Sequence, residues 1–119
     1  MSLLSDTPRI FWEGDSTVKQ NDFTSYPQCG IGQGFSLFVK KEILIVNRAE
    51  NGRSTKSFID EGRLEFIKEN IRKGDFLFVQ FGHNDEKNDP VRYTDPQTSF
   101  KDNLRTFIKV ARDAGAYPL

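Results

Sequence analysis

A glycine, a carboxylate and two hydroxyls stand in succession at Gly14, Asp15, Ser16 and Thr17, directly after an apolar, β-prone stretch at residues 10–12. Gly14 permits a sharp turn out of a strand, and the three residues after it are all types that cap helix N-termini. Free N–H groups of a following helix would surround the Ser16 hydroxyl with positive charge, which suits a nucleophile or a bound anion. An ordinary capped turn fits the same residues, so this motif alone does not fix a function.

The size and composition of the chain restrict the classes of protein to which it can belong. With 119 residues it forms one domain at most, residues 1–119, and its 36% hydrophobic residues are enough for a core. Seventeen basic and seventeen acidic residues give a formal net charge of zero, which argues against nucleic acid or a charged membrane surface as a partner. One cysteine, Cys29, and one histidine, His83, exclude an internal disulfide and imply no metal site. No secretion signal or membrane-spanning stretch is visible, which leaves the compartment open.

Three apolar runs, with helical patterns between them, predict an α/β fold. Strands are expected from residue 10 to the glycine at 14, at residues 42–47 and at residues 75–81, and the last run is apolar throughout, as in strands buried on both faces. The expected helices are a short one near residues 35–39, a short and then a longer one between residues 58 and 71, and one capped at Ser99 and stopped at Gly115. Residues 116–119 resemble the approach to a fourth strand. The glycine-rich residues 30–34 are not a dinucleotide loop, because they follow a polar loop rather than a strand.

Each predicted strand is followed by a residue that could serve acyl transfer. These residues are Ser16, Gly52 and Asn84, and the carboxyl ends of parallel strands meet at one edge of a sheet. The N–H groups of Ser16 and Gly52 and the side-chain amide of Asn84 could therefore surround the oxygen that becomes negative in the tetrahedral intermediate. Gly52 adds a backbone that a reacting atom can approach closely, since it has no Cβ.

Three blocks of sequence resemble a known family. In chain order they are Gly-Asp-Ser-Thr at residues 14–17, Asn-Gly-Arg-Ser at residues 51–54 and Gly-His-Asn-Asp at residues 82–85. Together with residues 60–64 and 89–96, they resemble the SGNH (GDSL) hydrolase superfamily and, within it, the rhamnogalacturonan acetylesterase branch. The resemblance spans almost the whole chain. It implies a flavodoxin-like three-layer α/β/α fold with a parallel sheet.

The same resemblance implies a reaction. Ser16 would be the nucleophile, and Gly52 and Asn84 the oxyanion donors, in the hydrolysis of acetyl esters on a pectic or related polysaccharide, with no cofactor. The proton acceptor of that family lies in an Asp-x-x-His motif, which residues 86–119 do not contain, and a serine hydroxyl without a base is a poor nucleophile. We therefore interpret the chain as the N-terminal part of such an esterase, truncated after the third strand and its helix. A non-catalytic flavodoxin-like binding or interaction module is the alternative.

Several further residues are candidates for the substrate side of the site. They are Asp15, Arg53, His83, Arg92 and Tyr93. Arginines suit the carboxylate of a galacturonate and an aromatic face suits a pyranose ring, although a solvated surface explains the same residues. Asp15 either orients the site or caps a turn, and Asp85 is expected to hold the Asn84 loop. His83 is expected not to reach Ser16, because neighbours at a strand end tend to point apart.

The resemblance also implies the sheet order 2-1-3-4-5. The third strand would then keep a bare apolar edge that begins at Phe76 and ends at Phe81, and such an edge invites pairing with another chain. We expect a partner chain, a swapped segment or further residues to cover it. Glu13 is expected at a partly open rim, Cys29 to be a small buried residue and Trp12 to lie in the core.

Overall fold

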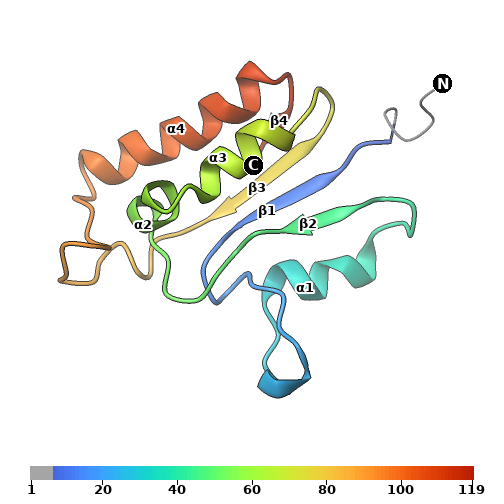
Figure 1. Ribbon diagram of the computed structural model, residues 1–119, viewed down its shortest axis with the longest axis horizontal. Coiled ribbons are helices and arrows are strands. Elements are labelled where there is room, and N and C mark those ends of the chain that lie inside the picture. The colour runs from blue at the N-terminus through green and yellow to red at the C-terminus, as the bar shows by residue number, and fades with distance from the viewer. Residues whose placement is uncertain (1–6) are drawn as a thin grey trace.

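A computed structural model describes residues 7–119 as a parallel four-stranded sheet between two layers of helix (Figure 1). The spatial order of the strands is β2-β1-β3-β4, and each neighbouring pair is parallel. The strands are β1 (Ile10–Gly14), β2 (Ile45–Asn47), β3 (Phe76–Gln80) and β4 (Tyr117–Pro118). The helices are α1 (Ile31–Phe35), α2 (Thr55–Asp60), α3 (Arg63–Asn70) and α4 (Ser99–Asp113), with 3-10 turns η2 (Phe23–Ser25) and η3 (Ser36–Phe38). The predicted α/β/α class is confirmed.

Strand β1 lies at the centre and is buried on both faces, because alternate side chains enter two separate cores. Phe11 packs on the side of α2, α3 and α4, where Phe58 and Phe107 are also fully buried. Trp12 packs on the side of α1, with its ring centroid 4.8 Å from that of Phe78. The expectation that Trp12 belongs to the core is confirmed. Packing on both faces holds β1 in place and thereby positions the turn that follows its carboxyl end.

The helices beside the first core follow the sequence pattern closely. A short helix, α2, precedes a longer one, α3, and Gly62 separates them in a left-handed conformation with φ +80°. Ser54 caps α2 and exchanges hydrogen bonds with Ser57 in a capping box. Helix α4 begins at Ser99, one residue after its N-cap Thr98. None of the helices in residues 7–119 has both the length and the apolar character that crossing a bilayer requires.

Helix α1 begins earlier than the apolar pattern predicts, inside the glycine-rich stretch. A Cβ on Gly32 would lie 2.8 Å from the carbonyl oxygen of Val18 and 2.6 Å from the Asn47 amide nitrogen. The glycine therefore permits close packing against Val18 and Asn47 inside the helix, despite the low helix propensity of glycine. Cys29, just before the helix, is exposed, so the expectation that it is buried is wrong. Its segment lies outside both cores.

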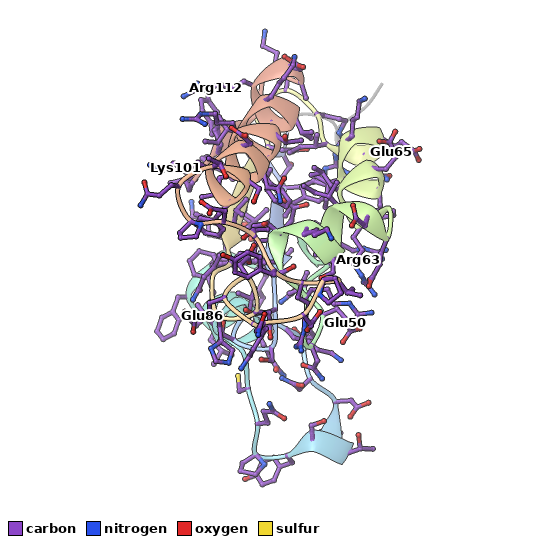
Figure 2. The ribbon with its side chains drawn as sticks, turned by 90° about the vertical axis from the view of Figure 1, so that its left-hand side faces the viewer. Glu50, Arg63, Glu65, Glu86, Lys101 and Arg112 are labelled. Carbon is purple, nitrogen blue, oxygen red and sulfur yellow. The ribbon has the colours of Figure 1, made fainter. Side chains whose placement is uncertain are left out.

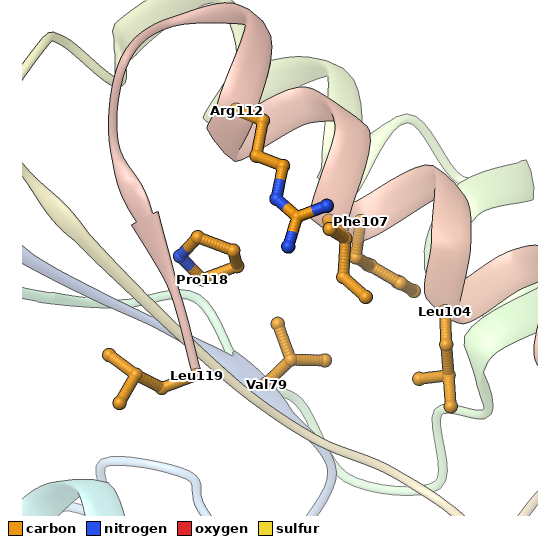
Figure 3. Close-up of a pocket in the computed structure, with 7 residues that line it drawn as sticks. Val79, Leu104, Phe107, Arg112, Pro118 and Leu119 are labelled. Carbon is orange, nitrogen blue, oxygen red and sulfur yellow. The ribbon is translucent and has the colours of Figure 1, made fainter.

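The free edge of β3 is partly covered by the end of the chain itself. Tyr117 and Pro118 pair with Phe76 and Leu77, and the Leu119 carbonyl accepts a hydrogen bond of 3.0 Å from the Val79 N–H. The expectation of a bare edge is therefore wrong for β3 up to residue 79, because residues 117–119 pair with that part of the strand. The sequence showed these last residues only as the approach to a strand. Beside this edge, an open groove of about 280 Å³ lies between α4 and β4 (Figure 3).

Glu13 is the one strongly polar residue of β1, and it is fully buried. Neither carboxyl oxygen has a hydrogen-bond partner among residues 7–119. Arg48 lies at the end of the neighbouring strand, where its backbone N–H donates to the Trp12 carbonyl. Its guanidinium does not pair with Glu13 but stacks on the Phe66 ring, 3.9 Å from the ring centre. Burial raises the pKa of Glu13 well above its usual 4.5. The expected partly open rim at Glu13 is therefore wrong, because the helices on the Phe11 side cover it.

The buried carboxyl predicts a pH-dependent stability. The folded protein keeps a proton on Glu13 that the unfolded chain releases above pH 4.5. Relative to Glu13→Gln, the native chain should lose about 1.4 kcal/mol of unfolding free energy per pH unit above that value, until the folded-state pKa is passed. Urea unfolding of both proteins from pH 4 to pH 8 measures the difference. The exposed Glu65→Gln on α3 (Figure 2) is the control, and parallel curves for Glu13→Gln and the native chain would contradict the assignment.

Candidate functional site

The turn after β1 leaves the hydroxyl and the N–H of Ser16 without hydrogen bonds to any residue that the structure describes. The Asp15 carbonyl accepts hydrogen bonds from the N–H groups of Val18 and Lys19, and its carboxylate accepts from the Thr17 N–H at 2.9 Å. Ser16 is half-buried, and within residues 7–119 neither its Oγ nor its N–H makes a hydrogen bond. No helix follows directly, contrary to the dipole expected from the capping residues. Among the N–H groups of residues 16–19, the structure therefore leaves that of Ser16 alone available to an incoming oxygen.

The turn after β2 is fastened to the end of β1. The N–H of Glu50 donates to the Gly14 carbonyl at 3.2 Å, and the carboxylate of Glu50 pairs with Lys19 at 2.6 Å. Hydrogen bonding from Lys19 lowers the pKa of Glu50, so this carboxylate stays ionised and the ion pair persists at neutral pH. Two turns that are far apart in sequence are therefore held together.

Gly52 occupies a position in this turn that suits glycine. Its φ is +73°, a conformation that side-chain-bearing residues rarely adopt. No atom lies within 4 Å of where a Cβ would stand, so the space on that side is open. The Gly52 N–H has no intramolecular hydrogen bond among the described residues. It is a second unpaired donor at the same edge of the sheet as Ser16.

Asn84 joins the turns after the first two strands. Its Nδ2 donates to the carbonyl of Arg53 at 3.1 Å and to the carboxylate of Asp15 at 3.4 Å. These acceptors are the sequence neighbours of Gly52 and Ser16, respectively. The side-chain carbonyl of Asn84 accepts a 3.4 Å hydrogen bond from Arg92, and the residue is buried. The structure therefore brings the segments of Ser16, Gly52 and Asn84 together at one edge.

Asp85 fixes the Asn84 loop to helix α2. Its buried carboxylate accepts hydrogen bonds from the Thr55 N–H at 3.0 Å, from the Thr55 hydroxyl and from the Thr94 hydroxyl at 2.8 Å. Thr55 is the first residue of α2, where an N–H lacks a helical partner and a negative charge is favoured. The expectation that Asp85 holds this loop is confirmed.

The remaining candidate substrate-binding residues differ in their contacts and in their exposure. Arg92 pairs with Asp89 at 2.6 Å and reaches Asn84, while Arg53 pairs with Glu61 at 3.0 Å. His83 is exposed and, within residues 7–119, forms no hydrogen bond. Tyr93 is half-exposed and lines a pocket of about 320 Å³ beside the Asn84 loop. Substrate contact by Asp15, Arg53, His83, Arg92 and Tyr93 stays a prediction.

Sequence reasoning missed the polar residues that fasten the turn after β1 from outside. Asn47, at the end of β2, donates through Nδ2 to the Val18 carbonyl at 2.8 Å. Lys19 and Glu50 close the same region by their ion pair. Asparagine after an apolar run could have been noted as a strand-end signal, but the ion pair had no local signature because its partners are 31 positions apart.

Removing the Asp85 carboxylate tests whether it holds the Asn84 loop against helix α2. Asp85→Ala would leave the buried donors of Thr55 and Thr94 unpaired, which should lower the unfolding free energy by about 2–4 kcal/mol. Hydrogen exchange in the loop of residues 82–94 should also accelerate. Chemical unfolding and exchange measured by mass spectrometry check both effects. Glu86→Ala, at an exposed neighbour (Figure 2), should change neither, and an equal response of the two variants would contradict the role of Asp85.

The chain is similar to two curated proteins of Bacillus subtilis across nearly all its length. It is 48% identical over 111 residues to the probable rhamnogalacturonan acetylesterase YesY, covering 92% of this chain and 51% of that protein. It is 42% identical over 111 residues to the rhamnogalacturonan acetylesterase RhgT, covering 93% of this chain and 47% of that protein. The chain thus spans about half the length of these relatives. No protein-family model matches it.

A solved structure agrees with the sequence relatives. The crystal structure of protein YxiM from Bacillus subtilis superposes with a TM-score of 0.78 at 29% identity, over 94% of this chain and 31% of that one. Motifs, fold and relatives agree: over nearly its whole length the chain is similar to rhamnogalacturonan acetylesterases, the branch of the SGNH (GDSL) hydrolase superfamily that its motifs resemble.

Proposed function

We propose that this chain belongs to an esterase that hydrolyses acetyl esters on rhamnogalacturonan or a similar polysaccharide, with Ser16 as the nucleophile. The observation that carries the proposal is the Asn84 carboxamide, which bonds to residues adjacent to both Ser16 and Gly52. Two relatives above 40% identity are named as rhamnogalacturonan acetylesterases, which supports the choice of reaction. No cofactor is part of the proposal.

In the proposed reaction, Ser16 Oγ attacks the acetyl carbonyl carbon and the carbonyl oxygen becomes negative. The unpaired N–H groups of Ser16 and Gly52 would donate to that oxygen, and the Asn84 Nδ2 would supply a third hydrogen bond. The contact of Nδ2 with Asp15 is long, at 3.4 Å, so the oxyanion can replace this acceptor at small cost. The open space beside Gly52 leaves room for the acetyl group.

The proton of Ser16 needs an acceptor from elsewhere. Within residues 7–119 no base is hydrogen-bonded to Ser16 Oγ, and His83 is exposed without an orienting partner. We place the proton acceptor outside these 119 residues, since the relatives are about twice as long. Because the Ser16 hydroxyl has no hydrogen-bond partner in the described part of the chain, a second candidate is also favoured, a module that binds acetylated carbohydrate without cleaving it.

External imidazole distinguishes the two candidates. If Ser16 lacks only its base, imidazole should take that role and should accelerate both fluorophosphonate labelling and p-nitrophenyl acetate turnover. Ser16→Ala should lose labelling and should show only the background reaction with imidazole. Ser36→Ala, at an exposed serine, is the control and should retain both. Identical rates for Ser16→Ala and the native chain would exclude the esterase and leave the binding module.

Replacing the Asn84 amide tests the oxyanion donor. Asn84→Asp keeps the shape but removes the two N–H groups, so the Ser16-dependent rate with imidazole should fall about 100- to 1,000-fold. Asn88→Asp makes the same chemical change at an exposed position of the same loop and should leave the rate unchanged. A loss below threefold in Asn84→Asp, with circular dichroism unchanged, would remove Asn84 from the proposed machinery.

A further inference from the structure

Residues 20–29, which we call the tip loop, extend away from the sheet and helices directly after the Ser16 turn (Figure 1). The base of this loop is closed by two backbone hydrogen bonds. Ile31 donates to the Thr17 carbonyl at 2.7 Å, and Gly32 donates to the Val18 carbonyl at 3.2 Å. The tip loop is therefore anchored within two residues of the proposed nucleophile.

The tip loop carries two aromatic rings that pack against neither core. The side chain of Phe23 is 94% exposed and that of Tyr26 is 79% exposed. Large apolar side chains grouped at such exposure mark surfaces that bind a ligand or a partner. The flat faces of these rings match the C–H-rich face of a pyranose ring, and aromatic residues supply this contact at low cost in conformational entropy.

Polar groups beside the rings are free to bind hydroxyls. A hollow of about 370 Å³ is lined by both rings and by the amides of Gln20 and Gln28. Within the described residues, neither amide makes an intramolecular hydrogen bond. Each carbamoyl group offers two donors and an acceptor, which suits the paired hydroxyls of a sugar. Rings together with unpaired amides are the chemistry of a carbohydrate subsite.

The charge of the tip loop selects the kind of sugar. Asp22 is its only charged residue, and hydrogen bonds from the Thr24 side chain and backbone lower the pKa of Asp22. The tip loop has no Lys or Arg to pair with the carboxylate of a galacturonate, and Asp22 adds a negative charge, so a neutral sugar is favoured. In a rhamnogalacturonan chain, the neutral unit is rhamnose.

The tip loop is already held by hydrogen bonds to helix α1 and within itself. The Gln33 amide of α1 accepts from the Asn21 N–H at 2.9 Å and donates to the Asn21 carbonyl at 3.1 Å, which ties the start of the loop to the helix. Asp22 caps the 3-10 turn η2, which presents Phe23. Binding would therefore lose little loop entropy, which favours affinity.

From these contacts we propose that the tip loop is a carbohydrate subsite that holds a neutral pyranose of the polysaccharide chain beside the Ser16 site, through the faces of Phe23 and Tyr26. The inference rests on the proposed function, because it takes the substrate of the esterase as its ligand. It assigns recognition of the polysaccharide backbone to the tip loop, which is separate from the residues proposed to hydrolyse the acetyl ester.

Binding can be measured without hydrolysis in the Ser16→Ala protein. We expect calorimetry with a deacetylated rhamnogalacturonan oligosaccharide to show affinity that falls at least fivefold in Tyr26→Ala and in Phe23→Ala. Phe38→Ala, which removes an equally exposed ring from η3 outside the tip loop, is the matched control and should bind normally. All four proteins should melt at the same temperature, because the replaced rings lie outside the cores.

Three results would overturn the proposal. They are tighter binding of an oligogalacturonate than of the rhamnogalacturonan oligosaccharide, equal losses in Tyr26→Ala and Phe38→Ala, and absence of any binding. The test of the subsite can fail or succeed independently of the test of the esterase reaction. If Ser16 is not labelled but Tyr26→Ala loses affinity, the reaction is wrong and the subsite stands. If Ser16 is labelled but the tip-loop variants bind normally, the subsite is wrong and the reaction stands.

Discussion

The side-chain amide of Asn84 is the contact on which the candidate site depends. It can reach Asp15 and Arg53 only because β1 pairs in parallel with both β2 and β3, so that the turns after all three strands lie at one edge. The buried carboxylate of Asp85 then holds the loop that carries this amide against helix α2. The parallel sheet brings the three turns close together, and the hydrogen bonds of a few buried polar side chains fix their relative positions.

The site is built from two kinds of polar group with different roles. Asp15 and Asp85 are buried and bonded to the protein, so they position the turns. Asn84 holds the turns together through Arg53 and Asp15 and is also the third proposed oxyanion donor. The N–H groups of Ser16 and Gly52 are unpaired among the described residues, which leaves them available to an incoming oxygen. Donors that are held in place but not yet bonded need little reorganisation when charge develops, and this is the basis of oxyanion stabilisation.

Local patterns predicted most of the fold, and the exceptions have identifiable causes. The runs at β1 and β3 were unambiguous because they are continuous and apolar. Helix α1 was misplaced because it begins among glycines, where the apolar pattern gives no helical signal, and Gly32 there packs closely against Val18. Strand β4 was only hinted at, since two residues become a strand solely through their pairing with β3.

The same limit applies to the site. The sequence placed Ser16, Gly52 and Asn84 at three strand ends, because strand ends can be read from apolar runs. It could not show that Glu13 is buried without a hydrogen-bond partner among residues 7–119, because its burial depends on helices that follow much later in the chain. The ion pair of Lys19 with Glu50 escaped notice for the same reason.

A crystal structure of the chain with a phosphonate bound to Ser16 would show whether the three donors converge, because the phosphonyl oxygen occupies the position of the oxyanion. We expect this oxygen to lie within hydrogen-bond distance, about 3 Å, of the N–H groups of Ser16 and Gly52 and of the Asn84 Nδ2. An oxygen that points into solvent, or that contacts Ser16 alone while Gly52 and Asn84 face elsewhere, would contradict this expectation.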